Sequence, residues 1–181
     1  ILPELRRLFP ALQQCNEEAL YRALNIAEPS LIRTEADEVT YCLHIILRYE
    51  IEKAIFRDNV PVSELPALWN RKMQELLLIT PANDAEGILQ DMHWSDGSFG
   101  YFPTYLLGSI YDGMYLDALT KELGDLDTIL SEGRIAEITE WLNKKIHVYG
   151  NTRLPKDTID AVCGVPVSAE PLMRYFREKY E

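Results

Sequence analysis

Residues 34–56, TEADEVTYCLHIILRYEIEKAIF, decide the fold. This stretch contains neither Gly nor Pro, and its apolar side chains recur every three or four residues, at Val39, Cys42, Leu43, Ile46, Leu47 and Ile51. That period is typical of an α-helix with one buried face. Further apolar side chains widen the stripe, so we expect most of the helix circumference to be buried. The pattern predicts a central helix from about Thr34 to Phe56, with Thr34 and Glu35 near its exposed backbone donors.

Helical periodicity continues on both sides of this segment. Before it, residues 5–12 predict a helix that Pro10 interrupts, and Asn16 is expected to cap a second helix that runs to Leu24. After it, Ser63 is expected to cap a helix that ends before residues 80–81, Thr-Pro.

Three more helices are predicted in the second half of the sequence. One begins at Pro103 and runs toward Gly124, one covers residues 135–146, and the last starts at Ser168. Gly108 and Gly113 are expected to allow close helix packing. Because no strand-like alternation of convincing length occurs, we predict an all-α fold and a single helical domain over residues 1–181.

The composition of the chain disfavours some classes of partner. The chain has 181 residues, is 47% hydrophobic and carries a formal net charge of -11, so nucleic acid and anionic membrane surfaces are disfavoured as partners. Three widely spaced cysteines fit a reducing cytoplasm, and no signal peptide or membrane-length apolar run is present. The sequence opens at Ile1 without an initiator Met, and we therefore expect a fragment of a longer chain.

Residues 87–105, GILQDMHWSDGSFGYFPTY, concentrate chemically capable side chains in one loop. His93 is the candidate proton or hydrogen-bond donor at neutral pH. Asp91 and His93 are only two potential metal ligands, fewer than a catalytic zinc site uses, so we predict no metal site in this chain. His44 is expected to be an interior residue, and His147 is explained by the end of a helix.

Two further features are candidates for substrate contacts. Tyr101 and Tyr105 are four residues apart across a helix start, and phenols can stabilise an oxyanion, although aromatic packing explains either one almost as well. Arg33 precedes the central helix and could hold a carboxylate through two hydrogen bonds, with Asp37 fixing its rotamer.

Two segments, residues 32–37 (IRTEAD) and Gly87-x-x-Gln90-Asp91-x-His93-Trp94, together resemble signature motifs of the carboxypeptidase Taq family of zinc metallocarboxypeptidases. The resemblance covers most of the chain after Pro29. It implies the helical C-terminal part of a zincin-type metallopeptidase with a deep substrate groove, in a protein that is usually a cytoplasmic homodimer.

The resemblance also implies an activity. Enzymes of this family are hydrolases that release single amino acids from peptide C-termini, using water activated by zinc or another divalent metal such as cobalt. Their metal-binding motifs, H-e-x-x-H and H-E-S/T-Q, are absent from this sequence. We therefore expect those motifs upstream of Ile1, in a missing N-terminal part, and we expect no metal bound to the fragment alone.

The resemblance assigns roles to individual residues. His93 and Tyr105 would donate hydrogen bonds to the substrate carbonyl or the tetrahedral intermediate, with Tyr101 as the competing phenol. Arg33 would either bind the terminal carboxylate or pair structurally with Asp37 or Asp91. The side chains expected to position the loop are those of Gln90, Asp91 and Trp94.

Two other functions are compatible with these residues. A non-catalytic helical interaction domain, or a degenerate relative of the family, would use the loop only as a rigid corner. A helical endopeptidase would differ from a carboxypeptidase in its products, since it cuts peptides internally.

Overall fold

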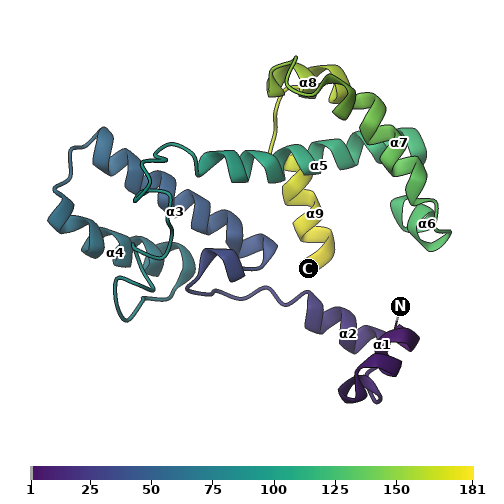
Figure 1. Cartoon of the computed structure of the whole chain (residues 1–181), viewed down its shortest axis with the longest axis horizontal. Helices are drawn as coiled ribbons and strands as arrows, with labels where there is room; N and C mark the ends of the chain where they lie inside the picture. The colour runs from purple at the N-terminus through teal and green to yellow at the C-terminus, as the bar shows by residue number, and fades with distance from the viewer. Residues whose placement is uncertain (1) are drawn as a thin grey trace. The chain divides into compact units, whose positions relative to one another are not determined.

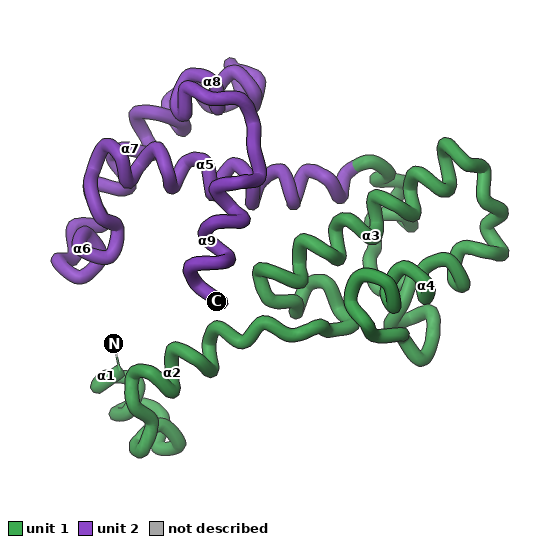
Figure 2. Tube along the Cα trace, turned by 180° about the vertical axis from the view of Figure 1, so that it is seen from behind, with its two compact units in different colours: residues 1–100 green, residues 101–181 purple. Residues whose placement is uncertain are grey.

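The computed structural model describes residues 2–181, and the regular structure in this range is entirely helical (Figure 1). The predicted all-α class is confirmed. Ile1, where the predicted domain begins, lies outside the described residues. The chain divides into two compact units, residues 1–100 and residues 101–181 (Figure 2).

Residues 2–100, the described part of unit 1, contain four α-helices and three short 3₁₀ turns. The helices are α1 (Leu2–Leu8), α2 (Glu17–Leu24), α3 (Glu38–Phe56) and α4 (Leu65–Leu77), and the turns are Pro10–Leu12, Arg33–Glu35 and Val62–Glu64. Both predictions for the first helices are confirmed, because the chain breaks before Pro10 and Asn16 Oδ1 accepts a hydrogen bond from Ala19 N at 2.7 Å. Helices α3 and α4 pack together around a buried cluster of Leu47, Ile51, Trp69, Met73 and Leu77.

The central helix begins four residues later than predicted. Asp37 is its N-cap: Oδ1 of this side chain accepts hydrogen bonds from the backbone N–H groups of Val39 and Thr40, both at 2.9 Å. A carboxylate that accepts hydrogen bonds from the first backbone N–H groups of a helix fixes the residue at which the helix begins. Thr34 and Glu35 therefore belong to the preceding 3₁₀ turn, and their placement at the helix start was wrong.

The buried face of α3 is more polar than expected. Ile46 and Tyr49, which belong to the predicted apolar surface, are 36% and 47% exposed, whereas His44, Arg48 and Glu52 are almost completely buried. The prediction of a wide apolar surface on this helix is thus only partly correct. Three polar side chains at four-residue spacing share one side of the helix, because residues four apart lie one turn above each other.

Helix α4 starts without a side-chain cap. Ser63 lies within the 3₁₀ turn Val62–Glu64, and α4 begins at Leu65 with Pro66 in its first turn. The predicted Ser63 cap is wrong. Proline has the dihedral angle that a helix start requires and lacks an N–H group that would need a partner there.

Unit 2 contains five α-helices. They are α5 (Pro103–Leu123), α6 (Leu126–Ser131), α7 (Ile135–Lys145), α8 (Pro155–Cys163) and α9 (Glu170–Tyr180). Helix α5 packs against α7, α8 and α9. The predicted helices from Pro103 and over residues 135–146 are confirmed, but α6 and α8 were not predicted, and the last helix starts two residues after Ser168.

The two helical glycines of α5 differ in their surroundings. A Cβ atom built on Gly113 would lie 2.8 Å from the backbone nitrogen of Leu172 in α9, whereas one built on Gly108 meets no heavy atom within 4 Å in the described part of the chain. Close packing is therefore confirmed for Gly113 and wrong for Gly108.

We expect Gly113→Ala to lower the free energy of unfolding by about 1–3 kcal/mol, since the new methyl group would force α5 and α9 apart. Gly108→Ala is the matched control. It should raise the stability by roughly 0.5–1 kcal/mol, because alanine favours a helix and space is available. Urea denaturation measures both variants, and a Gly113→Ala protein as stable as the wild type would contradict the close contact.

Candidate functional site

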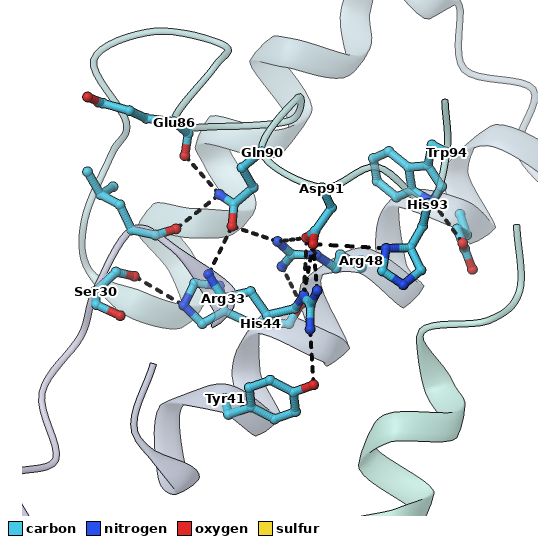
Figure 3. A network of polar contacts seen from close by, with 12 residues as sticks. Ser30, Arg33, Tyr41, His44, Arg48, Glu86, Gln90, Asp91, His93 and Trp94 are labelled. Carbon is cyan, nitrogen blue, oxygen red and sulfur yellow. Dashed lines mark hydrogen bonds and ion pairs between the residues drawn. The ribbon is translucent and has the colours of Figure 1, made fainter. Parts of the chain in front are cut away.

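The Asp91 carboxylate lies between two guanidinium groups of unit 1 (Figure 3). Arg33 donates to Oδ1 through Nε at 3.1 Å and through Nη2 at 2.6 Å. Arg48, from α3, donates to Oδ2 through Nε at 2.6 Å. Charge-assisted contacts of this kind are the strongest hydrogen bonds that side chains form, so Asp91 joins the 3₁₀ turn, helix α3 and the loop at one point.

These three charged groups are shielded from water. Arg33 is 7% exposed and Arg48 is completely buried. Burial lowers the pKa of Arg48 to about 10, although Asp91 opposes this change. Burial alone would raise the pKa of Asp91, but hydrogen bonds and charges from Arg33 and Arg48 outweigh it and hold that pKa below its ordinary value of 3.8. All three groups are therefore charged at neutral pH.

Gln90 extends the network to the backbone. Its Oε1 accepts hydrogen bonds from the backbone N–H of Arg33 at 3.0 Å and from Arg48 Nη2 at 2.8 Å. Its Nε2 donates to the carbonyl oxygens of Leu31 and Glu86, at 3.0 and 2.8 Å. The amide thus ties the chain before α3 to the loop after α4.

The structure decides between the two structural partners proposed for Arg33. Its guanidinium contacts Asp91, and its Nη1 donates to the hydroxyl of Tyr41 at 3.1 Å. Asp37 is instead occupied at the start of α3, where it also accepts from Glu28 N at 3.1 Å. The prediction that Asp37 fixes the Arg33 rotamer is wrong, because the local backbone donors take its carboxylate.

A second anchor holds the far end of the loop. Glu52, on α3 and 6% exposed, accepts two hydrogen bonds on one oxygen, Oε1. The donors are Trp94 Nε1 at 2.9 Å and the backbone N–H of Gly100 at 3.0 Å. The Trp94 ring also meets Trp69 edge-on, with 6.0 Å between centroids, and stacks on Phe99.

His93 lies between these anchors in sequence and beside Asp91 in space (Figure 3). Its Nδ1 is 4.0 Å from Asp91 Oδ1, and its side chain is 19% exposed. The backbone around it forms a tight turn, since Ser98 N donates to the His93 carbonyl oxygen at 2.7 Å. The imidazole is therefore accessible to a ligand and is carried by a compact loop.

The two tyrosines belong to unit 2. The rings of Tyr101 and Tyr105 meet edge-on with 5.4 Å between centroids, and Tyr101 is 50% exposed. The prediction that they face the same side of the loop-to-helix junction is confirmed.

The other histidines have structural surroundings. His44 is completely buried, and its Nε2 lies 3.1 Å from the carbonyl oxygen of Ser30, as expected for an interior residue. Burial, together with the positive charge of Arg48, lowers the pKa of His44 to about 4. His147 lies just after α7, where its Nδ1 is 2.8 Å from Asn143 Oδ1.

Residues 2–181 contain no group of three or more His, Cys, Asp or Glu side chains that could hold a metal ion. The residues present do not fit a metal centre. Within the same range, no helix is long and apolar enough to cross a bilayer.

Arg48 and Glu52 were not predicted as site residues. The sequence signal that could have identified them is their spacing: with His44 they place polar side chains every four residues along one side of an apolar helix. A buried charge at such a position requires a partner, and here the partners lie 42 to 48 residues away in sequence.

Comparison with known proteins identifies the class. The profile of the carboxypeptidase Taq (M32) metallopeptidases matches residues 1–180, and the chain belongs to this family. It is 48% identical to carboxypeptidase 1 of Bacillus subtilis over 159 residues, which are 88% of this chain and 32% of that protein. It is 39% identical to thermostable carboxypeptidase 1 of Thermus thermophilus, with 98% of this chain and 35% of that protein covered.

Solved structures of relatives are similar to this chain over nearly its whole length. The carboxypeptidase of Pyrococcus furiosus superposes with a TM-score of 0.95 at 37% identity, covering 99% of this chain and 36% of that one. The structure titled BsuCP gives 0.91 at 44% identity, covering 98% and 36%. The chain thus spans about a third of the length of the relatives it matches.

We expect the stability of the protein to fall by about 3 kcal/mol as the pH drops from 6.5 to 4, owing to His44. In this window an unfolded histidine binds a proton that the buried His44 does not, so acid favours the unfolded state. Urea denaturation at a series of pH values measures the slope. It should flatten in His44→Gln and remain in His147→Gln, and an unchanged slope in His44→Gln would contradict the assignment.

Proposed function

We propose that this chain is the substrate-binding part of a metallocarboxypeptidase that releases single amino acids from peptide C-termini. The observation that carries the proposal is that Arg33 and His93 share one neighbour. Arg33 Nη2 lies 2.6 Å from Asp91 Oδ1, and His93 Nδ1 lies 4.0 Å from the same oxygen. Asp91 thus lies beside both Arg33, which is suited to bind a carboxylate, and His93, which is suited to bind a carbonyl oxygen.

The closeness of Arg33 and His93 to one carboxylate oxygen supports an exopeptidase. In a peptide, the terminal carboxylate and the scissile carbonyl belong to consecutive residues, whose α-carbons are about 3.8 Å apart. Arg33 is proposed as the contact of the carboxylate, since guanidinium groups match carboxylates in geometry and charge, and it would keep its pairing with Asp91 while it does so. His93 would then donate a hydrogen bond to the oxygen of the neighbouring carbonyl as negative charge develops on it.

The remaining residues support these two. Gln90, Asp91 and Trp94 hold the loop, and Asp37 acts indirectly because it fixes the start of α3. From the family resemblance, Tyr105 is proposed as the second hydrogen-bond donor to the oxyanion, with Tyr101 as the competing phenol.

The proposal concerns the whole protein, to which this chain contributes a part. A zinc ion or another divalent metal such as cobalt would supply Lewis-acid chemistry and an activated water, held by residues outside this chain. Also by resemblance, the whole protein is proposed to work as a homodimer in the cytoplasm, with peptides as its substrates.

The test uses the protein expressed from its complete native reading frame and supplied with zinc. Short peptides should be shortened by one residue at a time, whereas C-terminally amidated peptides should resist. His93→Ala and Tyr105→Phe should each lower the rate by about 10²- to 10³-fold, the usual loss for one oxyanion donor. His147→Ala is the control and should keep its rate.

Three outcomes would contradict the proposal. Wild-type turnover in both His93→Ala and Tyr105→Phe would remove the assigned roles. Internal cleavage of peptides would indicate an endopeptidase, and a complete protein without any peptidase activity would favour a helical interaction domain.

A further inference from the structure

Helix α3 contacts the loop through two side chains that lie one turn apart. Arg48 donates to Asp91 and Gln90, which open the loop, and Glu52 accepts from Trp94 and Gly100, which lie farther along it. Residues at i and i+4 lie on the same side of a helix, so both side chains reach the loop from one surface. His93 follows the first pair of contacts and directly precedes Trp94.

The loop borders an open, largely apolar pocket of about 380 Å³ on the surface of unit 1. Its walls include Ile55 from α3, Leu65 from α4, and Ile88, Trp94 and Phe99 from the loop. Ile88 and Trp94 also pack on the buried cluster between α3 and α4. The polar contacts of Arg48 and Glu52 add to this packing and fix the direction in which the rest of the loop runs.

The loop has its own internal order. Asp96 N donates to the Met92 carbonyl oxygen at 3.1 Å, and Ser98 N donates to that of His93 at 2.7 Å. These bonds close a compact turn around His93. A compact turn that is anchored at both ends moves as one piece, so the anchors determine where the imidazole lies.

We propose that Arg48 and Glu52 are positioning residues that together place His93 for catalysis, Arg48 through Asp91 and Glu52 through Trp94 and Gly100. The catalytic consequence rests on the function proposed above for His93. The placement itself is a property of the loop and can be measured separately.

The two residues should differ in their kinetic effects. Arg48 contacts the same carboxylate as Arg33, so its loss should disturb both substrate binding and turnover. Glu52 contacts only the side of the loop beyond His93, so its loss should lower kcat while KM changes little, because the oxyanion contact is strongest in the transition state.

The first experiment follows the loop by NMR in the 181-residue chain. In the wild type, the indole N–H of Trp94 and the amide of Gly100 should exchange slowly with solvent. Glu52→Gln keeps an oxygen that can accept both hydrogen bonds and should retain slow exchange, whereas Glu52→Leu should lose it.

The control is Glu50→Leu, which removes a half-buried ion pair with Lys53 from the same helix. It should leave both exchange rates unchanged. The indole signal of Trp141, which lies in unit 2 and donates to Glu122, should keep its wild-type position in every variant. Fast exchange of Trp94 and Gly100 in the wild type, or slow exchange in a folded Glu52→Leu protein, would overturn the proposal.

The second experiment measures kinetics in the protein from the complete native reading frame. Glu52→Leu should lower kcat at least about tenfold with KM within about twofold, since small misplacements of a catalytic group are costly. Glu52→Gln should restore kcat to within about threefold of the wild type. Equal losses in the Leu and Gln variants, or none in either, would overturn the positioning role.

The two experiments separate the two proposals. If His93→Ala also retains full activity, the function proposed for His93 has failed, and the exchange data alone then decide whether Glu52 holds the loop. If His93→Ala is impaired and Glu52→Leu is not, only the positioning role is lost.

Discussion

The pairing of Asp91 with two buried guanidinium groups is the constraint on which unit 1 depends. Arg33 and Arg48 are both withdrawn from water, and a buried charge is costly unless a partner of opposite sign lies in contact with it. The Asp91 carboxylate is that partner for both guanidinium groups. Because the three groups come from the 3₁₀ turn before α3, from α3 itself and from the loop after α4, a single cluster fixes three segments that are distant in sequence.

This cluster explains why a polar face is buried on a central helix. Apolar side chains on this face of α3 would have packed at a lower cost in free energy. They could not hold the Arg33 guanidinium and the His93 imidazole in fixed orientations beside each other. Packing and polar contacts act together on the loop: Ile88 and Trp94 pack on the core cluster, and hydrogen bonds with Arg48 and Glu52 fix the two ends of the loop. Pre-organised donors of this kind are what stabilisation of a developing oxyanion requires.

The sequence predicted those parts of the molecule that depend on local patterns. The all-α class, the break at Pro10, the Asn16 cap and the helix from Pro103 follow from periodicity and turn chemistry. The start of α3 was misplaced because several residues before Glu38 could cap a helix, and only the backbone geometry selects Asp37. Arg48 and Glu52 were missed for a different reason: their partners are more than 40 residues away, and periodicity carries no information about such contacts. The loop over residues 87–105 was recognised because it concentrates chemically capable side chains, and its resemblance to the family motif then assigned roles to individual residues.

A double-mutant cycle between Asp91 and Arg48 tests the central claim most directly. Urea denaturation of Asp91→Asn, Arg48→Met and the double variant gives their interaction energy. The account predicts that Asp91→Asn destabilises the chain strongly, because it leaves two buried guanidinium groups without a carboxylate, and that Arg48→Met costs less, because Asp91 keeps Arg33 as a partner. The coupling should reach the upper part of the usual range of about 0.5–3 kcal/mol. Additive losses in the double variant would show that the two residues act independently and would contradict the role given to Asp91.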